Sequence, residues 1–275
     1  MKNTLYFLLT LTVIFTYFAY VWKEKVHYDY LSEGVTDSTV QNFLLNSFNG
    51  MMLSTIPEKF NQPVLDWQEI IPEAQILKDH FAIIKAEAHN LIKDYHHIPR
   101  FNDVDSIQAP LIDYDNRDWK TFFFKFYGDF NETNCAKCPK TAELLRRLPV
   151  DLAMFSILEE DKNIPPHRGP WKGLLRLHLA IDIPSEAVIT IDDKDYRWEE
   201  GELFLFDDTY IHSVKNPKAK KIVLFMDIKR DHIPSIFHNI LNILGDDYFH
   251  KVNQGIEKRA QNRLNFIETQ QQGNY

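Results

Sequence analysis

The chain has 275 residues, of which 44% are hydrophobic and 13% aromatic, which is enough for one substantial domain with accessory segments. Its formal net charge of −8 argues against an electrostatic nucleic-acid binder, which would display a basic face, and no nucleic-acid-binding motif is present. The only cysteines, Cys135 and Cys138, cannot form a disulfide framework, and a single C-x-x-C pair does not complete a structural zinc site. We interpret them as incidental thiols or a local disulfide.

Residues 4–22 form an uncharged, mostly apolar stretch. About 20 apolar residues are what a helix needs to cross a bilayer, so this stretch predicts a membrane anchor at residues 1–25. Its far end is crowded with aromatic side chains, as in an interfacial belt, rather than with the small residues of a signal-peptide cleavage site. The flank after the span is slightly richer in lysine, which predicts a single-pass protein with its main domain in the cytoplasm.

An irregular, aromatic segment at residues 26–72 is predicted to be a connecting region. Apolar residues at helical spacing then predict a helix that begins after Pro72 and ends before Pro99. Residues 122–127 are dense in aromatic side chains and predict a buried strand. A short helix at residues 140–148 is expected after the C-x-x-C turn.

Short predicted strands separated by turns dominate the second half of the chain. They cover residues 153–158, 174–183, 187–191, 196–198, 203–206 and 222–228. Such strands at close spacing, without intervening helices, predict an antiparallel sandwich or a jelly-roll barrel. Helical spacing returns at residues 236–244. We therefore expect a mainly β domain with flanking helices over residues 73–232, followed by a C-terminal helical tail at residues 233–275.

The segment at residues 164–183 carries the candidate chemistry. Arg176 and His178 share one face of a predicted strand whose other face is apolar, so a guanidinium lies beside an imidazole. His167 lies on the turn before this strand, and His212 follows a later strand. Imidazoles delivered from strand ends suit iron, zinc, copper or nickel. A non-haem Fe(II) site would normally add a carboxylate two residues after the first histidine, where this chain has Gly169.

Four ordered motifs in the same half of the chain carry a family resemblance. They are H-x-G-P at residues 167–170, R-x-H at 176–178, W-x-E-G at 198–201 and F-D-D-x-x-x-H at 206–212. Over roughly residues 122–232 the chain resembles the catalytic domain of the aspartyl/asparaginyl β-hydroxylases. That family includes hydroxylases of Asp and Asn side chains and bacterial hydroxylases of the lipid A acyl chain. It also has glycine at the carboxylate position, so Gly169 supports the resemblance.

The resemblance implies a double-stranded β-helix, which is the cupin-like jelly roll, and an Fe(II) centre that uses 2-oxoglutarate and O₂. His167 and His212 match the two iron ligands. Residues that hold the cosubstrate are matched by Ser156, Arg176 and His178. Lys221 stands where animal members carry an arginine; its ammonium can pair with a carboxylate, but without the fork geometry of a guanidinium.

The implied function is hydroxylation of an unactivated C–H bond, with a lipid A acyl chain as the favoured substrate because of the predicted anchor. Protein Asp or Asn side chains are the alternative substrate. Two other classes remain open: a halogenase, since the missing carboxylate leaves room for halide, and a non-catalytic binding module. Asp207 and Asp208 are expected either to orient His212 through a hydrogen bond or to form an ordinary turn.

Overall fold

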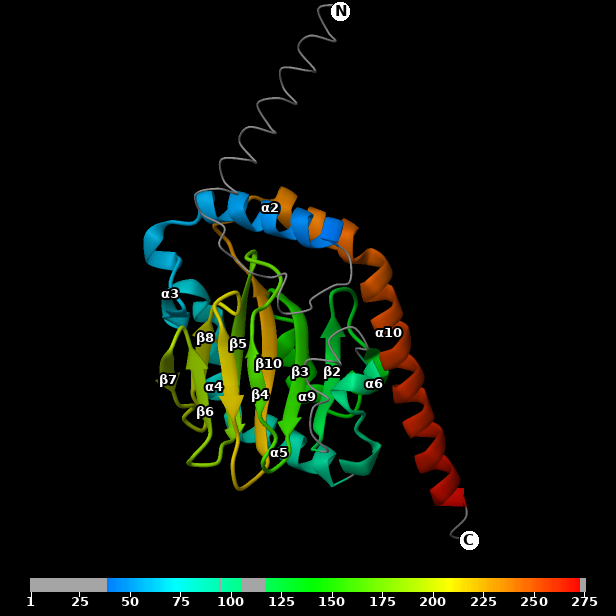
Figure 1. Ribbon diagram of the computed structural model, residues 1–275. Helices are drawn as coiled ribbons and strands as arrows, with labels where there is room; N and C mark the ends of the chain where they lie inside the picture. Colours follow the sequence, from blue (N-terminus) through cyan, green and yellow to red (C-terminus); the bar gives the residue numbers. More distant parts are fainter. Residues whose placement is uncertain (1–38, 94, 105–116, 273–275) are drawn as a thin grey trace, which may run out of the picture.

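Two antiparallel β-sheets face each other in the computed structural model, which describes residues 39–93, 95–104 and 117–272 (Figure 1). The six-stranded sheet has the order β1-β8-β5-β10-β3-β2, and the four-stranded sheet has the order β4-β9-β6-β7. The strands of the large sheet are β1 (Val64–Leu65), β2 (Trp119–Phe126), β3 (Val150–Leu158), β5 (Leu174–Asp182), β8 (Leu203–Phe206) and β10 (Lys221–Lys229). Those of the small sheet are β4 (Ile164–His167), β6 (Val188–Ile191), β7 (Lys194–Tyr196) and β9 (His212–Lys215).

The chain passes back and forth between the two sheets from β3 to β10. Strands β3, β5, β8 and β10 belong to the large sheet, and β4, the β6–β7 hairpin and β9 to the small one. This winding is that of a double-stranded β-helix, and it confirms the predicted jelly-roll core. Strands β1 and β2 extend the large sheet at its two edges.

Helices flank this core, as predicted. They are α2 (Thr39–Thr55), α3 (Trp67–Ile70), α4 (Gln75–Asp79), α5 (Phe81–Ile92), α6 (Phe101–Val104), α8 (Glu132–Cys135), α9 (Pro139–Leu145) and α10 (Ser235–Gln272), with 3₁₀ turns η2 (Glu58–Phe60), η3 (Pro72–Ala74) and η4 (Tyr95–His97). The single helix predicted after Pro72 is divided at His80, whose φ of −111° and ψ of 18° lie outside the helical range.

The large sheet is buried on both faces. Leu175, Leu177 and Leu179 of β5 pack with Leu77 and Ile84 of the helices on its outer face. Met154, Ala180 and Val223 belong to a second cluster, which also holds Ile189 and Val214 of the small sheet. The alternation predicted for β5 is therefore confirmed, and it turns Arg176 and His178 toward the space between the sheets.

Helices α2 and α10 close one end of the barrel (Figure 1). Met52 of α2, Trp171 of the β4–β5 loop and Ile233 just before α10 form a third apolar cluster there. From this end α10 runs along the edge of the large sheet at β2. The described ranges contain no helix with the length and apolarity to cross a bilayer. The anchor predicted at residues 1–25 lies outside the described residues.

Candidate active site

The two predicted metal ligands are direct cross-strand neighbours. The β4–β9 register pairs His167 with His212, and the centroids of their rings are 4.1 Å apart. The sequence predicted that His167 lies on a turn, which is wrong, because His167 is the last residue of strand β4. The strand Ile164–His167 escaped prediction because Pro165 and Pro166 are poor strand formers.

In the described part of the chain, each of the two rings forms its hydrogen bond through Nδ1. Nδ1 of His167 donates to the carbonyl oxygen of Pro165 over 2.9 Å, and Nδ1 of His212 donates to that of Tyr210 over 3.0 Å. In a neutral imidazole this arrangement leaves the lone pair on Nε2. Burial lowers the pKa of His167 to about 4 and that of His212 well below its usual value, so both rings are neutral at pH 7. Neutral rings with an available Nε2 are the form that binds a metal.

A neighbouring carboxylate occupies the space beside Gly169. The amide of Gly169 donates to the carbonyl oxygen of Asp208 over 2.7 Å. An ideal Cβ placed at Gly169 would lie 1.9 Å from Oδ2 of Asp208. Any side chain at this position would therefore collide with Asp208. The glycine that replaces the usual carboxylate makes room for a carboxylate from the other histidine-bearing loop.

Arg176 is held by two carboxylates. Its Nε and Nη2 donate to Asp227 over 2.9 and 3.2 Å, and Nη2 lies 2.9 Å from Oδ2 of Asp208. Burial would lower the pKa of Arg176, but Asp208 and Asp227 raise it above its usual value. Burial raises the pKa of Asp208 to about 7 against the opposing effect of Arg176. Tyr127 adds a hydrogen bond from its hydroxyl to Asp227 over 3.0 Å.

Asp227 and Tyr127 were not among the predicted site residues. A signal for Asp227 was available, because it is the one acidic residue in the apolar run of β10 and a buried carboxylate must be paired. Tyr127 gave no comparable signal, since it closes a run of aromatic residues that reads as core.

His178 presents a buried donor that lacks a protein partner. The indole nitrogen of Trp198 donates to Nδ1 of His178 over 3.2 Å, which leaves the ring proton on Nε2. Nε2 is buried and has no hydrogen-bond partner among the described residues. Burial, followed by the charge of Lys221, lowers the pKa of His178 well below its usual value, so the ring is a neutral donor.

Lys221 lies close to this donor. Its ammonium nitrogen is 3.8 Å from the centroid of the Trp198 ring, and the residue is 3% exposed. No carboxylate in the described part of the chain forms an ion pair with it, and burial lowers its pKa to about 7. Ser156, also buried, accepts a hydrogen bond from the indole of Trp119 over 2.9 Å. All the predicted cosubstrate residues thus lie on β3, β5 and β10 of the large sheet.

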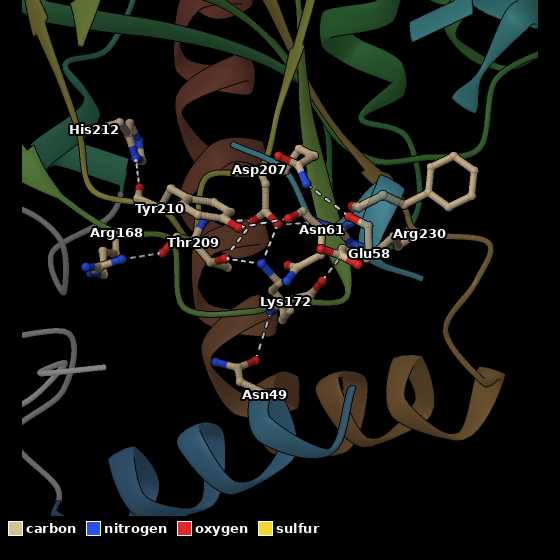
Figure 2. Close-up of polar contacts among 12 residues, drawn as sticks. Asn49, Glu58, Asn61, Arg168, Lys172, Asp207, Thr209, Tyr210, His212 and Arg230 are labelled. Atoms are coloured by element: carbon tan, nitrogen blue, oxygen red, sulfur yellow. Dashed lines mark hydrogen bonds and ion pairs between the residues drawn. The ribbon is translucent and has the colours of Figure 1, made fainter. Parts of the chain in front are cut away.

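Two roles were expected for Asp207 and Asp208. The hydrogen bond to His212 is wrong, because Nδ1 of His212 donates to the carbonyl oxygen of Tyr210. The turn is confirmed, because Asp207 Oδ1 accepts from the backbone N–H of Thr209 over 3.1 Å. Asp207 also accepts from Lys172 over 2.6 Å and pairs with Arg230 (Figure 2). The turn after Asp207 instead brings the backbone carbonyl of Tyr210 to the ring of His212.

A largely apolar cavity of about 140 Å³ lies next to His167, Arg176 and Asp227. His167, Arg168, Arg176, Asp208 and Asp227 line its polar end. Its apolar walls come from the strands, from α6 and from α10, and include Phe101, Trp119, Phe126, Leu152, Met154, Ile164, Leu174, Phe225, Leu241 and Phe249. The arrangement can hold a long apolar group with one end beside the histidine pair.

Within the described ranges, no three His, Cys, Asp or Glu side chains converge on a metal position. The fit to a metal therefore rests on two histidines. A backbone carbonyl orients each ring through Nδ1, and the available Nε2 atoms suit a divalent ion that takes its remaining ligands from water and small molecules. The cysteines are buried and not joined in a disulfide, and neither lines the cavity.

Comparison with known proteins places this site in a family. The chain is 38% identical over 185 residues to the ornithine lipid ester-linked acyl 2-hydroxylase of Rhizobium tropici, a match that covers 65% of each protein. It is 31% identical over 119 residues to the human aspartyl/asparaginyl beta-hydroxylase, covering 40% of this chain and 16% of that protein. The matched region is thus less than two thirds of either relative. Among solved structures, a Pseudomonas putida prolyl-4-hydroxylase covers 55% of this chain and 87% of its own with 12% identity and a TM-score of 0.36, too low to support an argument.

The sequence profile described as aspartyl/asparaginyl beta-hydroxylase matches residues 78–231, which is more than half of the chain and includes both histidines, Arg176, His178 and Lys221. The predicted resemblance is confirmed: the chain belongs to the aspartyl/asparaginyl beta-hydroxylase family.

Proposed function

We propose that this protein is an Fe(II)- and 2-oxoglutarate-dependent hydroxylase that acts on an acyl chain of a membrane lipid. The observation that carries the proposal is the cross-strand pair His167–His212, in which both rings bond through Nδ1 and keep Nε2 for metal, with His167 lining the polar end of an apolar cavity. Hydroxylation is the activity for which the family is named.

His167 and His212 would hold the iron. When bound, iron and 2-oxoglutarate together supply the oxidising power that inserts one atom of O₂ into a C–H bond, with succinate and CO₂ as by-products. The protein's own contribution is geometric: the Pro165 and Tyr210 carbonyls fix both rings, and Asp208 fills the space beside Gly169.

Lys221 and His178 would hold 2-oxoglutarate. A dicarboxylate needs a cation or several donors at each end. Among the described residues, Lys221 has no carboxylate partner and the buried Nε2–H of His178 has no acceptor, so the pair offers both groups. Ser156, whose hydroxyl can still donate, would add a third donor from β3. Arg176 already carries two carboxylates, so its part in the site is to fix Asp208 and Asp227 and to offer its remaining N–H groups.

The apolar walls of the cavity favour an acyl chain as substrate. Moving a hydrocarbon from water to such a wall lowers its free energy, whereas the polar side chain of Asp or Asn would lose hydrogen bonds to water. The Rhizobium tropici relative, named for an ester-linked acyl chain, supports the same substrate class. The predicted single span at residues 4–22 would hold the enzyme at its substrate; it stays a prediction, as does the cytoplasmic position of the domain.

Hydroxylation of Asp or Asn side chains in a protein is the second candidate. One observation favours it: Arg168 lines the same cavity next to His167 and carries a positive charge for a substrate carboxylate. The human relative is named for this reaction.

Two measurements test the proposal. The full-length protein in detergent, supplied with Fe(II), ascorbate and 2-oxoglutarate, should form succinate, and His167→Ala or His212→Ala should abolish both succinate formation and iron binding. Mass spectrometry of lipids from cells with and without the protein should show one added oxygen in an acyl chain, and it separates lipid A from aminolipids by their headgroup fragments. Absence of both iron binding and succinate formation would overturn the enzyme assignment. Unchanged lipids together with succinate formation would favour a protein substrate over a lipid.

A further inference from the structure

Two loops carry the histidine pair, and neither has regular secondary structure. The β4–β5 loop, residues 168–173, begins directly after His167. The β8–β9 loop, residues 207–211, ends directly before His212. The position of each ring therefore depends on what holds its loop, since the flanking strands β4 and β9 are only four residues long.

A buried group of polar side chains, the Lys172 cluster, joins these loops below the site (Figure 2). It consists of Lys172, Asp207, Thr209 and Arg230, none more than 2% exposed. Lys172 Nζ lies 2.6 Å from Asp207 Oδ2 and 3.2 Å from Thr209 Oγ1, and Thr209 Oγ1 donates to Asp207 Oδ1 over 2.6 Å. Arg230 pairs with Asp207 and donates from Nε to the carbonyl of Lys172 over 3.0 Å. Each loop is thus bonded to the other by side chains that water does not reach.

Asn49 extends the cluster to the amino-terminal helix α2. Its side-chain oxygen accepts from the backbone N–H of Lys172 over 2.9 Å, and its amide donates to the carbonyl of Pro170 over 3.0 Å. The side chain is 4% exposed. Both hydrogen bonds reach the backbone of the β4–β5 loop, at the first and last positions of a three-residue stretch. Such a clamp sets the path of the loop three residues after His167.

The energetics favour a role in geometry over one in stability. Taking several charged groups out of water costs about as much free energy as their attraction returns, so a buried ion cluster adds little net stability compared with apolar packing. What it provides is direction, because each partner must occupy one position to satisfy the others. Here the groups held in position belong to the two loops that adjoin the histidines.

We infer that Asn49 and Thr209 are positioning residues for the metal centre, and that α2 is thereby a required part of the catalytic unit. Through the Lys172 cluster they hold the loops at the separation that lets His167 and His212 share one ion. This inference rests on the proposed function, since it concerns the metal site proposed above. It extends that proposal to a segment outside the residues matched by the family profile, 78–231.

The test uses the full-length protein and Co(II), an O₂-stable stand-in for Fe(II) with a visible spectrum. Asn49→Ala removes both loop contacts, and Thr209→Val removes one hydroxyl at nearly constant volume. Thr209→Ser keeps that hydroxyl, and Ser54→Ala alters the exposed end of α2, where the hydroxyl donates to the nearby carbonyl of Met51. Asn49→Ala and Thr209→Val should each raise the Co(II) dissociation constant about 10-fold, the low end for loss of a residue that orients ligands, and should change the cobalt d–d spectrum. Thr209→Ser and Ser54→Ala should stay within about 2-fold of the unaltered protein.

The outcomes separate the two proposals. If Asn49→Ala and Thr209→Val lower the melting temperature but leave the dissociation constant and the spectrum unchanged, the residues serve the fold alone and the inference is overturned. Failure of both variants to fold would overturn it equally. If Asn49→Ala alone fails to fold, Thr209→Val decides. Absence of Co(II) and Fe(II) binding by the unaltered protein would instead overturn the proposed function.

Discussion

Gly169 and Asp208 share one small volume beside the histidine pair, because a Cβ atom at Gly169 would lie 1.9 Å from the Asp208 carboxylate. The sequence pattern that lacks a ligand carboxylate at this position thus has a steric reason. Gly169→Asp alone cannot supply a ligand carboxylate, because the space it needs is occupied by Asp208.

Gly169→Ala is expected to lower the free energy of unfolding by about 1–3 kcal/mol, the usual cost of overpacking. Unfolding in urea measures it. Gly128→Ala is the matched control, since its added Cβ would meet nothing nearer than 3.6 Å. Adding Asp208→Ala to Gly169→Ala should recover part of the loss. Equal stability of Gly169→Ala and Gly128→Ala would show that Asp208 moves aside freely.

Lys221 makes the affinity for 2-oxoglutarate depend on pH. Burial lowers its pKa to about 7 in the free protein, below the value of about 10.4 for an exposed lysine. Only the protonated amine pairs with a carboxylate. As pH rises through 7 the free protein loses this proton and must regain it on binding, so the dissociation constant should rise by up to about 10-fold per pH unit.

Titration calorimetry with saturating Mn(II) at pH 6.5, 7.5 and 8.5 tests this dependence. Lys221→Arg keeps its charge throughout, so its dissociation constant should be nearly flat over the range. Lys221→Met should bind weakly at every pH. The same slope in Lys221→Arg as in the unaltered protein would assign the proton to another group.

Met154 tests the acyl-chain cavity. It lies on β3, is 1% exposed and lines the apolar wall. Met154→Trp should fill part of the cavity and lower kcat/KM for the lipid about 100-fold, which corresponds to about 2.7 kcal/mol of transition-state binding. Met154→Leu, nearly equal in volume, should cost little. Succinate formed without lipid should be unchanged in both; a parallel fall in that background rate would indicate general damage to the site.

Cys135 should be unreactive and dispensable. Burial raises the pKa of its thiol to about 11, so the thiolate fraction at pH 8 is on the order of one in a thousand. Alkylation by iodoacetamide should be slow at pH 8 and accelerate with each pH unit up to about 11. Cys135→Ser should leave metal binding and succinate formation intact, and their loss would reveal a function for the C-x-x-C pair.

Local pattern was sufficient for much of the fold. Alternation in β5 predicted which face carries Arg176 and His178, and strand β8 was predicted with its observed bounds, Leu203–Phe206. These predictions succeeded because a strand with two different faces alternates in residue type, so every second residue reports the same environment. Strands β4 and β9 were missed, since two prolines and a four-residue length leave no such period. The histidines were found by motif, yet the strands that deliver them were not.

The sequence by itself determined the residue types of the site: two histidines, a glycine in place of a carboxylate, and a guanidinium and an imidazole on alternating positions of one strand. Only the tertiary structure decided how they are used. It paired His167 with His212 across two strands, paired Arg176 with Asp208 and Asp227, and gave Lys221 no carboxylate partner within the described ranges. It also brought Asn49 to a loop 121 residues away. Periodicity reports burial along one element, whereas partners across strands and loops are set by register and packing, which no local pattern records.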